Sequence, residues 1–465
     1  MLDLIKAIIL ATSYFIVAPV GGMIIAKDKR MEDFAVVLLM FLLGLHINTT
    51  VLMLGSIEWY RGVTKGYEFT MMEVLSISII FATIFNGKKK FIWLPMGTLL
   101  WFLYVSASSL SILTALNTNY VLMSILKHAK VWLIVYAIAN YARNRRDIHV
   151  VLTGLCIMLI YQFFIVAKMK WIDGFYQVRG LFEHQNPLAM FTYMAVFPIL
   201  GAAMSPSVSR FRSLFYLFTY ACSAIIVLAS LSRASLVFFA FGSIVMITMG
   251  FFDRITKRRI LIVSVMSFGG TLVLLMTIGT ILARFNDEGN QASGETRDVM
   301  NLAAKAMLDE NPLGIGWNNF GKAINHPYHY GDVIDNWNRE RGQKVDYDYA
   351  KGVVESHYWL LKGETGWLGY LTYMLFITVV TFKTVPLILT RRGSLEASIA
   401  AGILIGFSIT YVHSSLERVL TQTKNLALWM TYIGLLGACV RLIPEKLEKK
   451  KEFIEQLLQP NNTEK

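Results

Sequence analysis

The residues best suited to chemistry in this sequence are arginines, carboxylates and a histidine in its polar segments. Arg233 stands between two long apolar runs, and Arg297 lies near the start of the longest polar stretch. An arginine at the edge of a hydrocarbon layer is costly unless it snorkels or pairs with an anion, so Arg233 is a candidate for binding an anionic group. Arg297 is a candidate because it is a basic residue on the predicted outer face, against the positive-inside bias. His357, at the end of the same stretch, can act as a general base near neutral pH, and Glu355 is a carboxylate beside it. The alternative for His357 is a hydrogen-bonded residue at a membrane interface.

A second group lies in the segment 179–189, RGLFEHQNPLA, which leads into an apolar run. Asn186 precedes Pro187, and proline favours the first turn of a helix, so we expect Asn186 to cap that helix. The first turn would then present backbone N–H groups that favour anions. Arg179 and Asn186 are therefore predicted to bind substrate, and an ordinary capped helix start is the alternative.

Two glycine motifs follow. The segment 311–316 reads NPLGIG, and the segment 364–369 reads ETGWLG. Glycines two residues apart after Pro312 predict a tight backbone turn beside a ligand, although this motif alone is a weak signal.

Lys127 and Lys130 fall inside an apolar run, where ionisable residues are functional candidates. We expect them to line a cavity that receives the charged part of a substrate. The alternative is that the helix starts later and both lysines lie at the outer interface.

The composition is that of a membrane protein. Of 465 residues, 55% are hydrophobic and 16% are charged. The net charge of +13 comes from short basic clusters between apolar runs, a pattern that suits membrane topology and not nucleic-acid binding. No Asp, Glu or His cluster has the spacing of metal ligands, so neither a metal nor a cofactor is expected.

The apolar runs predict an all-α, polytopic integral membrane protein with about 12–13 transmembrane helices and one large external loop. The first run is long enough to span a bilayer and is followed by a basic cluster, so we interpret it as a membrane span and not as a cleaved signal. The predicted spans are 4–25, 34–54, 69–85, 91–113, 119–140, 148–167, 187–203, 213–231, 234–251, 260–282, 358–382, 394–412 and 425–442.

The basic clusters define the predicted topology. Each lies after an odd-numbered run, so the positive-inside rule places these connections on the cytoplasmic side. The long polar stretch then lies outside, on the periplasmic face of a bacterial inner membrane. The predicted divisions are ten transmembrane helices in 1–283, the large periplasmic loop with short helices in 284–357, three further helices in 358–442 and a cytoplasmic tail in 443–465.

Four of these segments together resemble the bacterial O-antigen ligase and O-antigen polymerase superfamily of membrane glycosyltransferases. The matching residues are the segment 179–189, the Ser232-Arg233 turn, Arg297 followed by 311–316, and the segment 364–369. Each motif is loose, but their order and spacing are fairly specific. The resemblance covers about residues 175 to 370 by motif and the whole chain by topology.

The resemblance implies transfer of glycan from a polyprenyl diphosphate-linked saccharide donor to the hydroxyl of a glycan or glycolipid acceptor, at the membrane lipid surface. It implies that Arg233 and Arg297 bind the diphosphate, that Arg179 and Asn186 support them, and that no metal is needed. Arginine can bind phosphate oxygens bidentately and stabilise the departing charge, which agrees with this chemistry. Polysaccharide assembly proteins are possible partners.

The sequence departs from the ligase pattern at one position. That pattern has a histidine eleven positions before the first glycine of the Gly366, Gly369 pair, and counting back gives Glu355. His357 comes two residues later. Either residue can therefore be the base toward the acceptor, and the departure favours a polymerase over a ligase.

Two other functions compete. A small-solute transporter would carry charged residues through several spans, whereas most ionisable residues here lie at the predicted outer face. A non-catalytic envelope assembly partner would use the long loop for docking.

Overall fold

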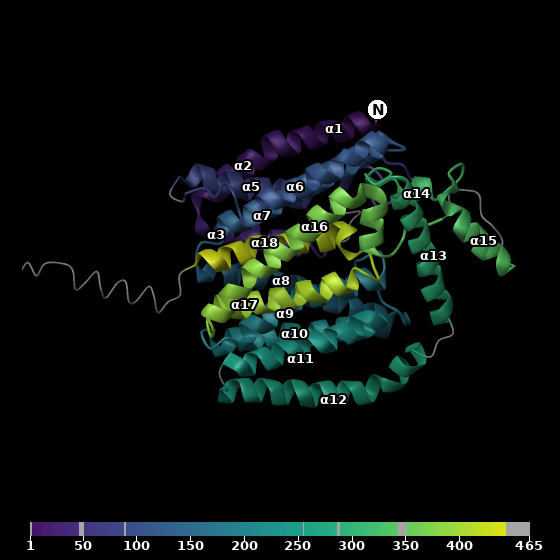
Figure 1. Ribbon diagram of the computed structural model, residues 1–465. Helices are drawn as coiled ribbons and strands as arrows, with labels where there is room; N and C mark the ends of the chain where they lie inside the picture. The colour runs from purple at the N-terminus through teal and green to yellow at the C-terminus, as the bar shows by residue number, and fades with distance from the viewer. Residues whose placement is uncertain are drawn as a thin grey trace, which may run out of the picture.

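The computed structural model describes residues 2–45, 51–87, 90–253, 255–285, 289–342 and 351–442. Within these ranges, long apolar helices lie side by side and short helices gather at one end of the bundle (Figure 1). Eight of the described helices are long and apolar enough to cross a membrane, and Met71–Asn86 and Thr98–Thr114 are shorter apolar helices. The structure therefore confirms the predicted all-α, multi-pass membrane architecture.

The first half of the chain supplies one edge of the bundle and much of its centre (Figure 1). A five-residue π-helical stretch, Ser13–Val17, joins the first two helices into one span. The helices are α1 (Leu2–Thr12), α2 (Ala18–Lys27), α3 (Lys29–Leu42), α5 (Met71–Asn86), α6 (Thr98–Ser109), α7 (Thr118–Tyr141) and α8 (Arg145–Ala167).

The predicted span 34–54 is wrong in its second half. Helix α3 ends at Leu42, and Val51–Leu54 forms strand β1, which pairs antiparallel with β2 (Tyr67–Thr70). A short apolar run fits a strand as well as a helix, so its hydropathy could not separate the two. The Lys6 ammonium donates to the Met53 carbonyl at 3.1 Å, which ties this hairpin to α1.

The second half of the chain supplies the other edge and returns to the centre (Figure 1). The predicted short turn at 231–233 is confirmed, because one helix ends at Ser230 and the next begins at Arg233. The helices are α9 (Gln185–Met204), α10 (Arg210–Ser230), α11 (Arg233–Asp253), α12 (Lys257–Phe285), α16 (His357–Thr390), α17 (Leu395–His413) and α18 (Thr423–Arg441).

Helices α13 (Gly289–Glu310), α14 (Phe320–Ala323) and α15 (Asp332–Glu340) lie together at one end of the bundle, and α13 runs across the helix ends (Figure 1). The apolar face of α13 carries Ala303, Ala304 and Met307, which pack in one buried cluster with Leu360 of α16. This packing fixes the polar face of α13 relative to the membrane helices. The predicted tail, 443–465, lies outside the described residues.

The basic clusters meet at the other end of the bundle. The Arg145 guanidinium pairs with Glu396 at the start of α17 at 2.6 Å, and Arg441 at the end of α18 donates to the Ala139 carbonyl at 2.7 Å. Arg391 donates to the Cys439 carbonyl at 3.3 Å. Clusters that were predicted to share one side of the membrane therefore lie together, away from α13 (Figure 1).

Candidate functional site

Four segments that are distant in sequence meet around Arg297 on α13. Its guanidinium pairs with Glu355, which lies just before α16, and with Glu417, which follows α17, at 3.2 Å from Nη2 to Oε1. The side-chain amide of Asn186, near the start of α9, donates to the same Glu417 oxygen at 2.7 Å. We call Arg297, Glu355, Glu417 and Asn186 the arginine–carboxylate cluster.

The start of α16 is fixed where it meets the end of α17. Ser356 caps α16, and the backbone N–H of His357 donates to the carbonyl of Ser414 at 2.9 Å. Because Ser414 directly follows α17 and Glu417 is three residues further on, this bond holds Glu355 close to Glu417. The neighbouring Arg418 donates to the Val353 carbonyl at 2.9 Å and strengthens the same junction.

The cluster is partly open to solvent and mixed in charge. The exposed fraction of the side chain is 46% for Glu355, 34% for Arg297 and 17% for Glu417. Burial, followed by the nearby charge of Glu355, raises the pKa of Glu417 to about 7, although Arg297 acts in the opposite direction. The cluster therefore holds a guanidinium between two carboxyl groups, and the Glu417 carboxyl group can exchange a proton near neutral pH.

His357 lies apart from this cluster. His357 is 5% exposed, and it lines a small pocket that is also lined by His128, Trp317 and Glu364. Neither ring nitrogen has a hydrogen-bond partner among the described residues. Of the two candidate bases, Glu355 is therefore the one that contacts Arg297.

The predicted role of Asn186 as a helix cap is wrong. The helix begins at Gln185, earlier than expected, so Pro187 is its third residue and His184 is the cap. The Nδ1 atom of His184 accepts from the backbone N–H of Asn186 at 3.4 Å. This frees the Asn186 side chain to bond Glu417, so Asn186 joins the cluster through its amide.

The two other arginine candidates lie on other elements, Arg179 before α9 and Arg233 at the start of α11. Arg179 is exposed, and its guanidinium donates to the Glu183 carbonyl of its own segment at 3.5 Å. Arg233 is the first residue of α11 and is half-buried. Phe238, five residues later, packs on the ring of His413 at the end of α17, with 4.9 Å between ring centroids. Arg233 therefore lies toward the same end of the bundle as Glu417.

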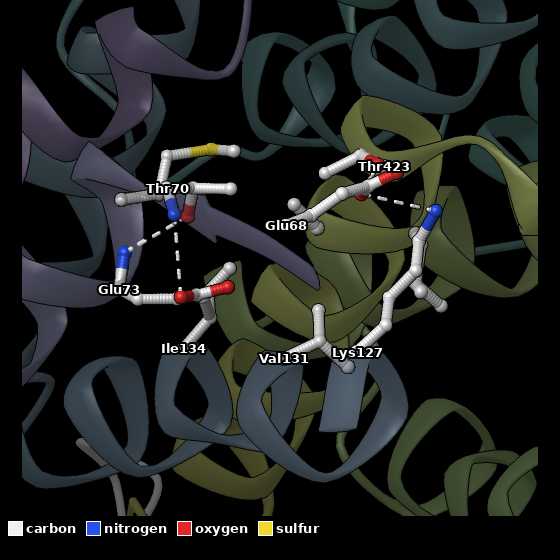
Figure 2. Close-up of a pocket in the computed structure, with 10 residues that line it drawn as sticks. Glu68, Thr70, Glu73, Lys127, Val131, Ile134 and Thr423 are labelled. Atoms are coloured by element: carbon white, nitrogen blue, oxygen red, sulfur yellow. Dashed lines mark hydrogen bonds and ion pairs between the residues drawn. The ribbon is translucent and has the colours of Figure 1, made fainter. Parts of the chain in front are cut away.

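Helix α7 begins at Thr118, before both lysines, so it does not start later as the alternative required. Lys127 is buried, Lys130 is half-buried, and both are ion-paired. Lys127 pairs with Glu68 at 3.3 Å and Lys130 with Glu73 at 3.0 Å; the lysine side chains are 6% and 11% exposed. Lys127 does line a cavity, whose empty volume is about 330 Å³. Figure 2 shows its ammonium group reaching Glu68, next to Thr423. Both lysine charges are therefore already neutralised.

The glycine motifs contact each other. The backbone N–H groups of Ile315 and Gly316 donate to the carbonyls of Gly363 and Glu364 at 3.0 and 3.1 Å. The carboxylate of Glu364 accepts from the Phe320 N–H at 3.1 Å. The motifs 311–316 and 364–369 thus join the long loop to α16.

Sequence reasoning missed Glu417 and Arg418. They are adjacent charged residues in the connection between α17 and α18, which the predicted topology already placed on the outer face. In the sequence, the signal that could have pointed to them was this pair of charged residues in a short connection that carries no motif. Only the fold shows that this connection lies beside Arg297.

No protein-family model matches the sequence, and no curated protein is significantly similar to it. The fold and the cluster therefore define a class only: a multi-pass membrane protein with a partly open arginine–carboxylate cluster at one end of its helical bundle.

Proposed function

We propose that this protein is a membrane glycosyltransferase that moves glycan from a polyprenyl diphosphate-linked saccharide to an acceptor hydroxyl. The supporting observation is the position of Arg297: it contacts Glu355 and Glu417 at the bundle end that carries α13 to α15. A diphosphate whose lipid chain lies in the membrane would meet the protein at such an end. The proposal places this end on the periplasmic face of a bacterial inner membrane.

The reaction needs an anion site and a base. Arg297, with Arg233 toward the same end of the bundle, would bind the diphosphate oxygens and stabilise the charge that develops as the sugar–phosphate C–O bond breaks. Glu355 would accept the proton of the acceptor hydroxyl while the hydroxyl oxygen bonds to the sugar carbon. The diphosphate leaves with the bonding electron pair, which completes the transfer.

Between the two branches of this chemistry, we favour polymerisation, with a growing polysaccharide as acceptor, over ligation to lipid A-core. A carboxylate stands at position 355, where the ligase pattern has a histidine, and it is this carboxylate that contacts Arg297. Polymerase and ligase share the donor and differ in what reaches the acceptor side.

Surface glycans of a deletion strain test the proposal. Complementation with the wild-type gene should restore long chains, whereas the variants Arg297→Ala and Arg233→Ala should not. Arg341→Ala is the matched control, because Arg341 is a loop arginine that pairs with Glu295, which is not a member of the cluster. Single repeat units on the lipid anchor indicate a lost polymerase, and full-length chains stranded on the carrier indicate a lost ligase. Normal glycans in both the Arg297→Ala and the Arg233→Ala variants, at normal protein levels, would refute the proposal.

Transport is the second candidate, because Lys127 and Lys130 lie deep in the membrane helix α7. Ionisable residues at such depth often mark a solute path. Both are paired with glutamates, which gives them a structural role in joining α7 to β2 and α5. Solute uptake by the purified protein in vesicles, without any lipid-linked sugar, would favour transport over transfer.

A further inference from the structure

The guanidinium of Arg297 is shared between two carboxyl groups, and this has a consequence for an anionic ligand. Arg297 carries one positive charge, whereas Glu355 and Glu417 carry two negative charges when both are ionised. A diphosphate diester brings two more negative charges to the same guanidinium. Like charges at this range repel, so one carboxyl group must move away or lose its charge when the diphosphate binds.

Glu417 makes the longer of the two contacts with Arg297, at 3.2 Å, so it is the carboxyl group that a diphosphate displaces more easily. Its charge is also the harder of the two to leave unpaired. Its side chain is 17% exposed, against 46% for Glu355, so water can solvate a displaced Glu355 carboxylate far better. Glu417 also keeps a second partner, because Asn186 donates to its Oε1 at 2.7 Å. That hydrogen bond can persist when the carboxyl group is protonated, since its carbonyl oxygen remains an acceptor.

We propose that the donor diphosphate displaces Glu417 from Arg297 and that the displaced carboxylate takes up a proton. This inference rests on the proposed function, since it concerns the same site. The charged groups that act on Glu417 come from several elements: Arg297 on α13, Glu355 before α16 and Arg418 in its own connection. Two of them are cationic and one is anionic, and the incoming diphosphate adds anionic charge.

The protonation of Glu417 is balanced near neutral pH before any ligand binds. Burial and the charge of Glu355 raise its pKa to about 7. Above that pH the group starts ionised and gains a proton on binding, whereas well below it the group is protonated in both states. Diphosphate affinity should therefore be constant at low pH and should fall by up to about tenfold per pH unit above pH 7.

Calorimetric titration of the purified full chain in detergent tests this proposal. The probe is dioctyl diphosphate, a symmetric diester that has no ionisation near neutral pH. Titration at pH 8 in two buffers with different ionisation enthalpies should show uptake of about one proton per ligand. This readout needs no variant, so it does not depend on how a substitution folds.

Two matched variants assign the proton. Glu417→Gln resembles the protonated form, so its affinity should be independent of pH and, at pH 8, higher than that of the wild type. Glu355→Gln removes the other carboxylate of Arg297, whose charge helps raise the pKa of Glu417, so affinity should still fall with pH by the same slope but from a lower pH than in the wild type. An affinity of the wild type that does not change with pH, or a pH dependence that survives in Glu417→Gln, overturns the inference and leaves the proposed function standing. Equal, negligible binding by the wild type and Arg297→Ala at every pH overturns both.

Discussion

Gly314 and Gly366 pack backbone against backbone, so that a methyl group on either would overlap the main chain beside the other. Both have left-handed φ angles, +84° and +63°. The Trp367 N–H donates to the Pro312 carbonyl at 3.0 Å and closes this contact. The two glycine motifs are thus joined to each other, and their glycines permit the close approach.

We predict that Gly366→Ala strongly destabilises the protein. Gly366 has φ +63° and ψ −164°, a backbone region open essentially to glycine alone, so the substitution adds a conformational cost of about 1–3 kcal/mol to an overlap with the Pro312 carbonyl. Thermal unfolding of the purified protein in detergent measures the effect. Gly174→Ala is the control, because Gly174 also has a positive φ, +73°, but no atom lies near its added methyl group. Equal losses in the two variants would show that the overlap contributes nothing.

We predict that Glu355→Gln lowers the transfer rate by about 10²–10⁴-fold, the usual contribution of a general base. His357→Gln should lower it much less, because the His357 imidazole is buried and Glu355 contacts Arg297. Transfer from a synthetic lipid diphosphate sugar, followed over a range of pH, compares the two. The reverse ranking would assign the base to His357.

We predict that Lys127→Met destabilises the protein by about 3 kcal/mol, since it leaves the charge of Glu68 buried without its cationic partner. The double variant Glu68→Gln, Lys127→Met should recover much of the loss. Unfolding midpoints in detergent measure both. Lys168→Met removes the ion pair of Lys168 with Asp173 and should have little effect, because the Lys168 side chain is 61% exposed. Absence of recovery in the double variant would argue that Lys127 acts through other contacts.

We predict that Glu417→Gln becomes more stable than the wild type as pH rises. The folded-state pKa of Glu417, about 7, lies above the ordinary value of 4.5, so the folded state binds more protons between these values. Wild-type stability therefore falls relative to Glu417→Gln from pH 4.5 to about 7, and the difference then levels off. Unfolding midpoints of both proteins across this range provide the measurement, and parallel curves would contradict the prediction.

The membrane helices could be predicted because their signal is strong and local. Runs of apolar residues near twenty in length identify α7, α8, α9 and α10 within a few residues of their observed bounds. The error at 34–54 arose where the run contained a strand. Hydropathy measures how apolar a segment is, and β1 is as apolar as a short stretch of helix.

The candidate site was predicted in part. Arg297, Glu355 and Asn186 were chosen from motifs, and the structure brings them together with Glu417. Glu417 lies in no motif, and its proximity depends on how α17 and α18 return to the bundle end. Such long-range contacts leave no local pattern in a single sequence. The cap at Asn186 failed because its neighbour His184 could also supply an acceptor, and the helix began earlier.

The hydrogen bonds between 312–316 and 363–367 also determine which part of the chain can be exchanged as a unit. A chimera that replaced only the residues up to the start of α16 would separate these backbone partners and leave their N–H and carbonyl groups without acceptors or donors. A graft that extends from α13 through Gly369 keeps them together. Any property that the loop 284–357 confers should therefore be transferable to another protein only when the first turns of α16 are moved along with the loop.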